Sequence, residues 1–301
     1  MISVLILTKN EEQDLPGCLE SVRWSDDVHV YDSYSTDRTV EIARAMGARV
    51  TQRRFDDWSS HQNWGLANIA LRHPWVLYID ADERVTPELV ASIQHAVQNH
   101  GGKVAFRIQR RDFWGEHWLK HVQASSHYLR LFRPERMRYE RLVNPVSVPD
   151  GPVGELAGYL DHYPFSKGMT HWLNRHNSYS SLEAQQIVKN RAANQPFSVV
   201  QAFFAKDRNQ RRFHQKELFY RMPARPFIKF LLLFVGKRGF LDGSAGFAYA
   251  MLQSFYEYMI VLKTKELAGK SARPAGVEKI LQDPVAGAIP ENLHANPGSN
   301  D

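Results

Sequence analysis

Short apolar runs alternate with amphipathic stretches along the first hundred residues. The runs 2–7 and 75–79 are almost entirely apolar, which is typical of strands buried on both faces. Over 13–23, in contrast, apolar residues recur at helical spacing. The pattern predicts strands over 2–7, 28–31, 48–50 and 75–79, and helices over 13–23, 38–46 and 61–71. This order predicts an α/β fold with a doubly wound, mostly parallel sheet flanked by helices.

Three of the predicted strands end in polar or acidic side chains. In a parallel α/β sheet, ligands bind at the carboxyl ends of the strands, and these ends share one edge. The side chains that this rule brings together are Thr8, Asn10, Glu11, Asp32, Asp80 and Asp82. One acidic strand end could arise by chance, whereas three on one edge predict a binding site.

Asp80 and Asp82 directly follow the apolar run 75–79. Residues two apart on an extended chain point the same way, so both carboxylates can face one point. Paired carboxylates suit Mg²⁺ or Mn²⁺, which complete their coordination with water and substrate phosphates. The alternative is a solvated turn in which Asp82 or Thr86 caps a helix that begins near Pro87.

Composition narrows the class of protein. The chain has 301 residues, of which 43% are hydrophobic, and its net charge of +6 favours an anionic partner. Cys18 is the only cysteine, so a reducing compartment is expected, and the first residues lack the basic region of a secretory signal. The glycine motifs of dinucleotide oxidoreductases and of P-loop proteins are both absent from the sequence. A metal ion held by Asp80 and Asp82 would neutralise phosphates without such a loop.

Three segments of the chain resemble the signature blocks of family 2 glycosyltransferases. They are Leu7–Glu12, Tyr31–Thr39 and Leu77–Glu83, within a resemblance that covers roughly residues 1–180. The chain is most similar to the bacterial branch that includes lipopolysaccharide core and exopolysaccharide glycosyltransferases. The resemblance implies a GT-A (Rossmann-like) fold and an inverting transfer of a sugar from a nucleotide sugar, expected to be a UDP-sugar. The implied acceptor is a saccharide or a lipid-linked saccharide.

The resemblance also implies roles for the strand-end residues. Thr8, Glu11 and Asp32 would contact the uridine, Asp80 the ribose or the metal, and Asp82 the metal. The donor-binding candidates are therefore Thr8, Asn10, Glu11, Asp32 and Asp80, and the metal-binding candidates are Asp80 and Asp82. For Asp32 the alternative is a turn aspartate that accepts hydrogen bonds from backbone amides.

The base that takes the proton of the acceptor hydroxyl is less evident. In related sequences a glutamate stands where this chain has Pro145, which has no acid–base chemistry. Glu140 and Asp150 are nearby candidates, although Glu140 is equally well explained as an ion-pair partner of Arg138 or Arg141. The alternative is a catalytically altered family member that acts as a membrane-associated binding or scaffold protein.

Aromatic and cationic residues of the expected acceptor half suggest further contacts. Trp114 and Trp118 could line a site for an acceptor sugar or belong to the core. Arg130 and Arg133 could contact pyrophosphate or lie solvated on the surface.

The last third of the chain combines basic and apolar segments. Basic residues are concentrated over 206–238, around the apolar run 227–235, and a second apolar segment covers 245–262. Apolar helices flanked by lysine and arginine are typical of an interfacial membrane-binding region, and neither segment predicts a transmembrane helix. The alternative is a helical subdomain that packs on the sheet. Nucleic-acid binding is not expected, since no motif accompanies the charge.

Together these patterns predict three regions. Residues 1–200 form the GT-A domain, with a donor half over 1–103 and an acceptor half over 104–200. Residues 201–270 form a basic and apolar helical region at an anionic membrane surface, and 271–301 form a linker and a disordered tail. The protein is expected in the cytoplasm, peripheral on the inner face of the membrane, with Mg²⁺ or Mn²⁺ as its cofactor.

Overall fold

The computed structural model describes residues 1–123, 125–140, 146–193, 197–205 and 208–271. Their contacts divide the chain into two compact units. Among the described residues, the first comprises Met1–Lys120 and the chain up to Met169, and the second comprises His121–Gln123 and the chain from Thr170 to Ser271. The predicted linker and tail lies outside the described residues, apart from Ser271.

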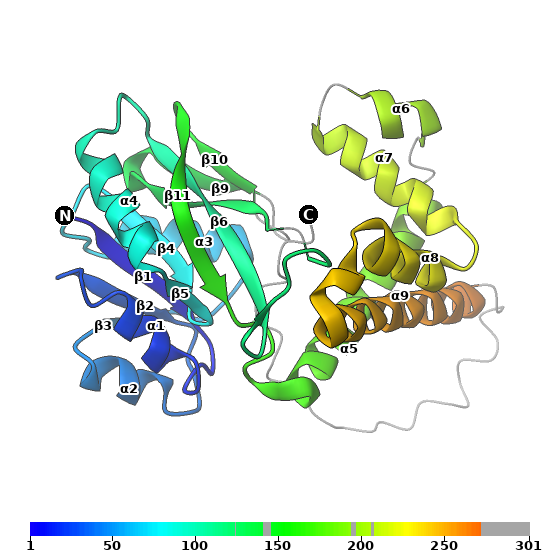
Figure 1. Cartoon of the computed structure of the whole chain (residues 1–301), viewed down its shortest axis with the longest axis horizontal. Helices are drawn as coiled ribbons and strands as arrows, with labels where there is room; N and C mark the ends of the chain where they lie inside the picture. Colours follow the sequence, from blue (N-terminus) through cyan, green and yellow to red (C-terminus); the bar gives the residue numbers. More distant parts are fainter. Residues whose placement is uncertain (124, 141–145, 194–196, 206–207, 272–301) are drawn as a thin grey trace. The chain divides into compact units, whose positions relative to one another are not determined.

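A nine-stranded sheet is the centre of the first unit (Figure 1). Its order is β3 (Arg49–Gln52), β2 (Val28–Asp32), β1 (Ser3–Thr8), β4 (Val76–Asp80), β8 (His127–Phe132), β6 (Ala105–Trp114), β11 (Val153–His162) and β5 (Glu83–Val85), and β7 (His117–Trp118) pairs with β6. The first four strands in this order are parallel neighbours. Beyond β4 the sheet is mixed, because β8 is antiparallel to both β4 and β6 while β6 and β11 are parallel. A separate two-stranded sheet consists of β9 (Met137–Glu140) and β10 (Val146–Pro149), after the short 3-10 helix η1 (Pro134–Arg136).

The alternation of side chains along the strands gives the sheet two apolar faces. On β1, Val4 and Ile6 belong to one buried cluster and Leu5 to the other, and all three are fully buried. The first cluster is covered by α1 (Leu15–Ser21), α2 (Thr39–Ala45) and α4 (Pro87–Gln98), and the second by α3 (Trp58–Asn68). The strands and helices predicted over the first hundred residues all occur, and the predicted α/β class is confirmed.

The turn after β4 was expected either to bind a metal ion or to be a solvated turn in which Asp82 or Thr86 caps the next helix. The cap of α4 shows which of these two residues is the capping one. The side-chain oxygen of Thr86 accepts a hydrogen bond from the Leu89 N–H at 3.3 Å, and Pro87 occupies the first turn of the helix. Thr86 is therefore the capping residue, and the Asp82 carboxylate contacts other groups.

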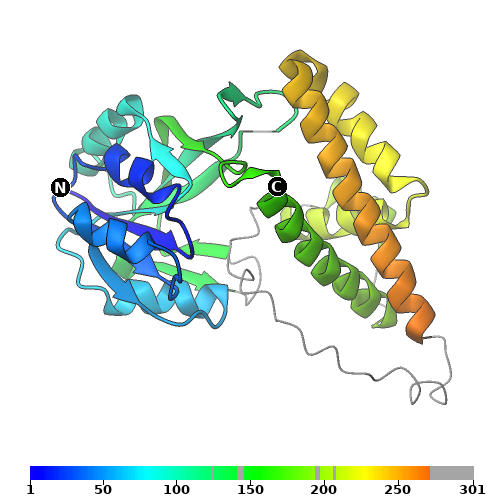
Figure 2. The same cartoon turned by 90° about the horizontal axis from the view of Figure 1, so that it is seen from below.

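The second unit is helical (Figure 2). Its elements are most of α5 (Gly168–Ala192), then α6 (Val199–Phe204), α7 (Arg208–Arg221), α8 (Arg225–Leu231), the π-helical turn η2 (Leu232–Gly236), the 3-10 turn η3 (Gly239–Asp242) and α9 (Gly243–Ser271). Lys263 links α9 to α5, since its ammonium group donates to the carbonyl oxygen of Asn177 at 2.6 Å and to the hydroxyls of Ser180 and Ser181 at 2.7 and 2.8 Å. No helix in the described part of the chain is both long enough and apolar enough to cross a membrane.

A short piece of the chain between β7 and β8 belongs to the helical unit. The buried Asp242 carboxylate accepts hydrogen bonds from the N–H groups of His121 and Val122 at 2.9 and 2.7 Å. A Cβ on Gly239 would lie 3.0 Å from the Val122 side chain and 2.8 Å from the Leu233 carbonyl oxygen, so the close approach of these segments favours glycine there. The turn that ends in Asp242 therefore holds His121–Gln123.

His176 lies inside this unit with an aromatic neighbour on each side. Its ring stacks on Trp172 at a centroid distance of 3.5 Å and meets Tyr256 edge-on at 5.1 Å. Nδ1 donates a hydrogen bond to the Trp172 carbonyl oxygen at 2.9 Å, which fixes the neutral tautomer. Burial lowers the pKa of His176 to about 4, and the hydrogen bond to Trp172 opposes this only in part.

We expect the helical unit to lose stability in mild acid because of this residue. The unfolded chain takes up the proton near pH 6.5, whereas the folded chain resists it down to about pH 4. The contribution is therefore complete above pH 6.5 and is lost as the pH falls through this window, by about 2–3 kcal/mol in all. The urea midpoint of His176→Gln should fall less between pH 7 and pH 4.5 than that of the wild type. Equal falls in the two proteins would contradict this assignment.

Candidate functional site

The loops that follow β1 and β2 are joined by hydrogen bonds. The backbone N–H of Asn10 donates to the Ser35 hydroxyl at 2.8 Å, and the Asn10 side-chain oxygen accepts from the Thr36 N–H at 2.8 Å. One residue further, the Glu11 N–H donates to the Thr39 hydroxyl at 2.7 Å. Asn10 adopts a left-handed conformation with φ 55°, which asparagine tolerates better than most residues. Asn10 thus links the loop after β1 to the loop after β2 through its backbone and its side chain.

Asp32 lies at the end of β2 and is fully buried. Its carboxylate accepts hydrogen bonds from the Thr8 hydroxyl at 3.0 Å, the Ser35 N–H at 2.9 Å and the Gln52 amide at 2.9 Å, and also from the Ser35 hydroxyl. A carboxylate offers about four acceptor positions, and these contacts use them. The structure therefore shows the turn-forming contacts of the local alternative, while a role toward the nucleotide stays a prediction.

Asp80 and Asp82 each face a cation across the edge of the sheet. Arg130 on β8 contacts Oδ2 of Asp80 at 2.7 Å, and His162 at the end of β11 contacts Oδ2 of Asp82 at 3.2 Å. Both aspartates remain partly accessible, with side chains 18% and 21% exposed. The carboxylates at this strand end are thus held in place from β8 and β11.

His162 joins Asp82 to a second carboxylate, that of Asp112 on β6, which contacts Nδ1 of its ring. Burial and the nearby Arg110 disfavour the charged imidazolium, but Asp82 and Asp112 outweigh them and raise the pKa of His162 to about 9. At neutral pH His162 is therefore a cation between two carboxylates. The chain's strand-end motifs did not point to His162 or Asp112, because 105–114 and 153–162 were not predicted as strands.

A buried ion cluster lies directly behind Asp80. Glu83 is fully buried, and its carboxylate accepts from Arg130 at 2.8 Å and from the Asp80 N–H at 2.9 Å. Arg110 approaches the same carboxylate at 3.8 Å. Surface solvation was one of the two interpretations of Arg130, and it is wrong, since the residue is only 7% exposed and its guanidinium pairs with Asp80 and Glu83.

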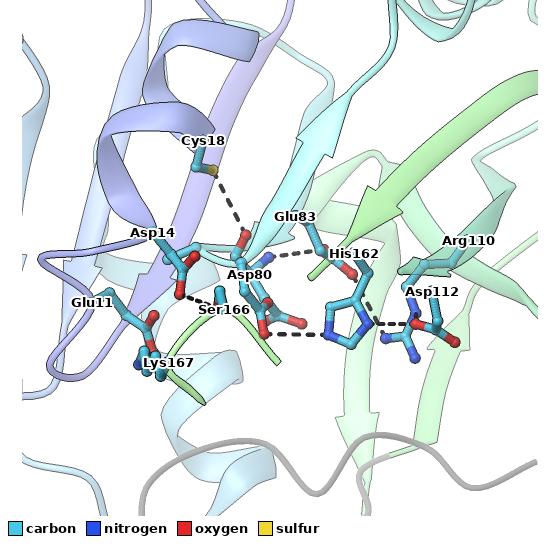
Figure 3. A network of polar contacts seen from close by, with 12 residues as sticks. Glu11, Asp14, Cys18, Asp80, Glu83, Arg110, Asp112, His162, Ser166 and Lys167 are labelled. Atoms are coloured by element: carbon cyan, nitrogen blue, oxygen red, sulfur yellow. Dashed lines mark hydrogen bonds and ion pairs between the residues drawn. The ribbon is translucent and has the colours of Figure 1, made fainter. Parts of the chain in front are cut away.

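The segment after β11 returns to the loop after β1. Lys167 contacts the Glu11 carboxylate at 2.5 Å and donates to the Asn10 carbonyl oxygen at 2.8 Å, and the Ser166 hydroxyl donates to Asp14 at 2.7 Å (Figure 3). Burial raises the pKa of Glu11 to about 8 in spite of Lys167, and its Oε2 is buried with no hydrogen-bond partner among the described residues. Glu11 is thus a carboxyl group with one oxygen left for a ligand at this edge.

The two candidate bases make ordinary surface ion pairs. Glu140 ends β9, is 54% exposed and pairs with Arg138 at 3.0 Å, as the alternative interpretation expected. Asp150 is 73% exposed and pairs with Arg136 at 3.1 Å. Neither makes a described contact with the network around Asp80 and Asp82. Pro145, which raised the question of the base, lies outside the described residues.

The side chains at the sheet edge can be compared with the ligands that Mg²⁺ and Mn²⁺ prefer. Asp80 and Asp82 supply hard oxygen donors with partial access to solvent, as Mg²⁺ and Mn²⁺ require, and such ions need only one or two carboxylates when substrate phosphates complete the shell. Over the described ranges, no group of three or more histidine, cysteine, aspartate or glutamate side chains is arranged to hold a metal ion. The residues present fit an ion shared with a phosphate ligand.

Residues 3–154, about half of the chain, match the family described as Glycosyl transferase family 2, so the chain belongs to this family. The predicted family and its GT-A fold class are thereby confirmed.

Among its relatives is the lipopolysaccharide core biosynthesis glycosyltransferase LpsC of Rhizobium meliloti, 27% identical over 91% of this chain and 95% of the relative. An uncharacterized glycosyltransferase of Rickettsia typhi is 25% identical over 90% of this chain and 88% of the relative. Among solved structures, glucosyl-3-phosphoglycerate synthase from Mycobacterium tuberculosis, in complex with Mn²⁺, UDP-glucose and phosphoglyceric acid, is 24% identical with a TM-score of 0.33. The match covers 36% of this chain and 44% of the synthase.

Proposed function

We propose that the chain is a metal-dependent inverting glycosyltransferase. It transfers a sugar from a nucleotide sugar, a UDP-sugar in our proposal, to a saccharide or lipid-linked saccharide used for a bacterial surface polysaccharide. One observation carries the proposal. Two partly accessible carboxylates, Asp80 and Asp82, lie at the same edge of the sheet as the hydrogen-bonded loops after β1 and β2. Membership of family 2 supports it.

The residues of this edge suggest a division of tasks. Asp80 and Asp82 would hold Mg²⁺ or Mn²⁺, which supplies electrostatic stabilisation of the charge that develops on the departing diphosphate. Thr8, Asn10, Glu11 and Asp32 would shape and bind the uridine side, with Oε2 of Glu11 available for a hydrogen bond to the ligand. Arg130 and His162 would orient the two aspartates, because each contacts one carboxylate oxygen.

Inversion in a single displacement also needs a base for the acceptor hydroxyl. Glu140 and Asp150 remain our candidates, and Glu140 stands directly before residues outside the described part of the chain. The scaffold alternative rests on Pro145, which lies among those residues, and no described contact favours it.

We also propose that the helical unit binds an anionic membrane surface from the cytoplasmic side. Large apolar side chains gather on α8, η2, η3 and α9, and each is between 41% and 62% exposed. They are Phe227, Leu231, Leu232, Val235, Phe240, Leu241, Phe247, Met251 and Phe255. Phe234 ties these elements together through ring contacts with Phe240 at 6.3 Å and Phe247 at 5.6 Å. An apolar surface of this extent marks an interaction site.

The charges beside this apolar surface favour a membrane as its partner. Lys229 lies on α8, Lys237 and Arg238 connect η2 to η3, and burial lowers the pKa of both lysines. Basic residues near an anionic leaflet are each attracted by about 1 kcal/mol, and apolar side chains add their transfer from water. The combination fits a peripheral protein that lies on the membrane.

Replacing Leu232 on η2 by glutamate should weaken vesicle binding by about tenfold, since a charge would enter the apolar contact. The measurement is co-sedimentation with vesicles of phosphatidylcholine and phosphatidylglycerol, and wild-type binding should decline as salt rises. Leu182→Glu on α5 is the matched control, because Leu182 is similarly exposed at 49% and lies outside the apolar surface. If the two variants sediment alike, or the wild type stays in solution at low salt, the membrane proposal is wrong.

A further inference from the structure

The ends of β6 and β11 present two different faces to their surroundings. The strands are parallel and in register from Tyr159 opposite Gln109 to His162 opposite Asp112. Paired residues of neighbouring strands leave the sheet on the same side, and successive residues alternate. Arg111 and Asp161 therefore share one face, and Asp112, His162 and Trp114 share the other.

The first of these faces is filled by its own side chains. Arg111 forms a two-point ion pair with Asp161 at 2.6 and 2.9 Å, and its guanidinium lies over the rings of Tyr159 at 4.4 Å and Trp118 at 5.3 Å. Trp118 is placed there by its pairing with Phe113 across the β6–β7 hairpin. The ring of Trp118 thus packs against side chains of the protein itself.

The second face continues from the carboxylate network to an aromatic pair. Trp114 lies two residues beyond Asp112 on the same side of β6, and Phe165 follows His162 by three residues. The rings of Trp114 and Phe165 meet at a centroid distance of 4.4 Å with an interplanar angle of 52°, and both residues are partly exposed. Gly115, with φ 58°, turns the chain directly after Trp114, so the indole stands at the end of the strand.

We propose that Trp114 and Phe165 form the platform on which a pyranose ring of the saccharide acceptor rests. The C–H face of a sugar packs on an aromatic face, and here that face lies beside His162 and Asp112, whose network includes Asp82. This inference rests on the proposed function. It assigns the acceptor to the Trp114 face of β6 and the nucleotide to the loops after β1 and β2.

Indole N–H signals in ¹⁵N–¹H spectra of the full chain test this platform without an activity assay. The Trp114 and Trp118 signals are assigned by their loss in Trp114→Phe and Trp118→Phe. The probes are cellobiose, lactose and the oligosaccharide released by mild acid from a rough-type lipopolysaccharide, each up to about 10 mM, which saturates millimolar sites. We expect at least one probe to shift the Trp114 signal and leave the Trp118 signal in place. The same probe should bind Trp114→Ala about tenfold more weakly and Trp118→Phe as tightly as the wild type.

Three results would overturn the inference: no shift of Trp114 with any probe, an equal shift of both indoles, or a Trp114 shift caused by UDP and Mn²⁺ without saccharide. Unchanged signals of the other indoles in each variant show that it is folded. These outcomes are distinct from failure of the proposed function, which is judged by nucleotide binding at Asp82 without any saccharide.

Discussion

Replacement of Asp82 by alanine should abolish Mn²⁺-dependent binding of a UDP-sugar and reduce sugar transfer by about 10²–10³-fold. Asp82 has a side chain 21% exposed at the same strand end as Asp80, and its Oδ2 is oriented by His162. Removing a group that stabilises charge developing in the transition state typically costs this much in rate. The measurement is isothermal titration calorimetry with UDP-glucose and related nucleotide sugars, each with and without Mn²⁺.

We expect Asp82→Ala to remain folded although it loses Mn²⁺-dependent binding. Tyr163 donates its N–H to the Asp82 backbone carbonyl at 3.0 Å, and that contact does not depend on the side chain. His162 would keep Asp112 as its partner, and Asp82→Asn offers a variant of nearly equal volume. Glu20→Gln is the control, because Glu20 is an exposed carboxylate whose side chain pairs with Arg23, which is also exposed. Unchanged Mn²⁺-dependent binding by Asp82→Ala would refute the metal assignment.

The polar strand ends of the candidate site could be predicted because they depend on local patterns. Each of β1, β2 and β4 is a short apolar run with a polar residue at its end, and parallel pairing then brings Thr8 opposite Asp32. The same rule holds for Asp112 and His162, since β6 and β11 are parallel to β4 through the antiparallel β8. These two were missed because β6 and β11 alternate polar and apolar residues and carry several charges, which conceals the strand ends.

Contacts between strands that are distant in the sequence could not be predicted from local patterns. Arg130 resembles a surface residue in sequence, and its burial depends on Glu83, which lies 47 residues away. Trp114 and Trp118 were equivalent candidates for a sugar platform, but the register of the β6–β7 hairpin turns them to opposite faces. In both cases the deciding fact is a pairing between strands, which residue types alone do not specify.

Replacement of Arg130 by methionine should destabilise the sheet unit by about 3–5 kcal/mol, because it leaves a buried carboxylate without its main partner. Arg130 contacts both Asp80 and Glu83, and after its loss the nearest described cation is Arg110, at 3.8 Å from Glu83. Burial already raises the pKa of Glu83, and losing the Arg130 charge would raise it further. Since a raised carboxyl pKa costs stability as the pH increases, the loss should be larger at pH 8 than at pH 5.

Urea unfolding followed by tryptophan fluorescence measures this effect, with Arg133→Met as the matched control. Arg133 follows the same strand, but it is 38% exposed and pairs with the exposed Glu135, so its loss should cost less than about 1 kcal/mol. The double change Arg130→Met with Glu83→Gln should recover part of the stability and remove most of the added pH dependence, because no unpaired charge remains buried. If Arg130→Met and Arg133→Met unfold at the same midpoint, the ion cluster behind Asp80 does not support the sheet, and Arg130 would serve the ligand site alone.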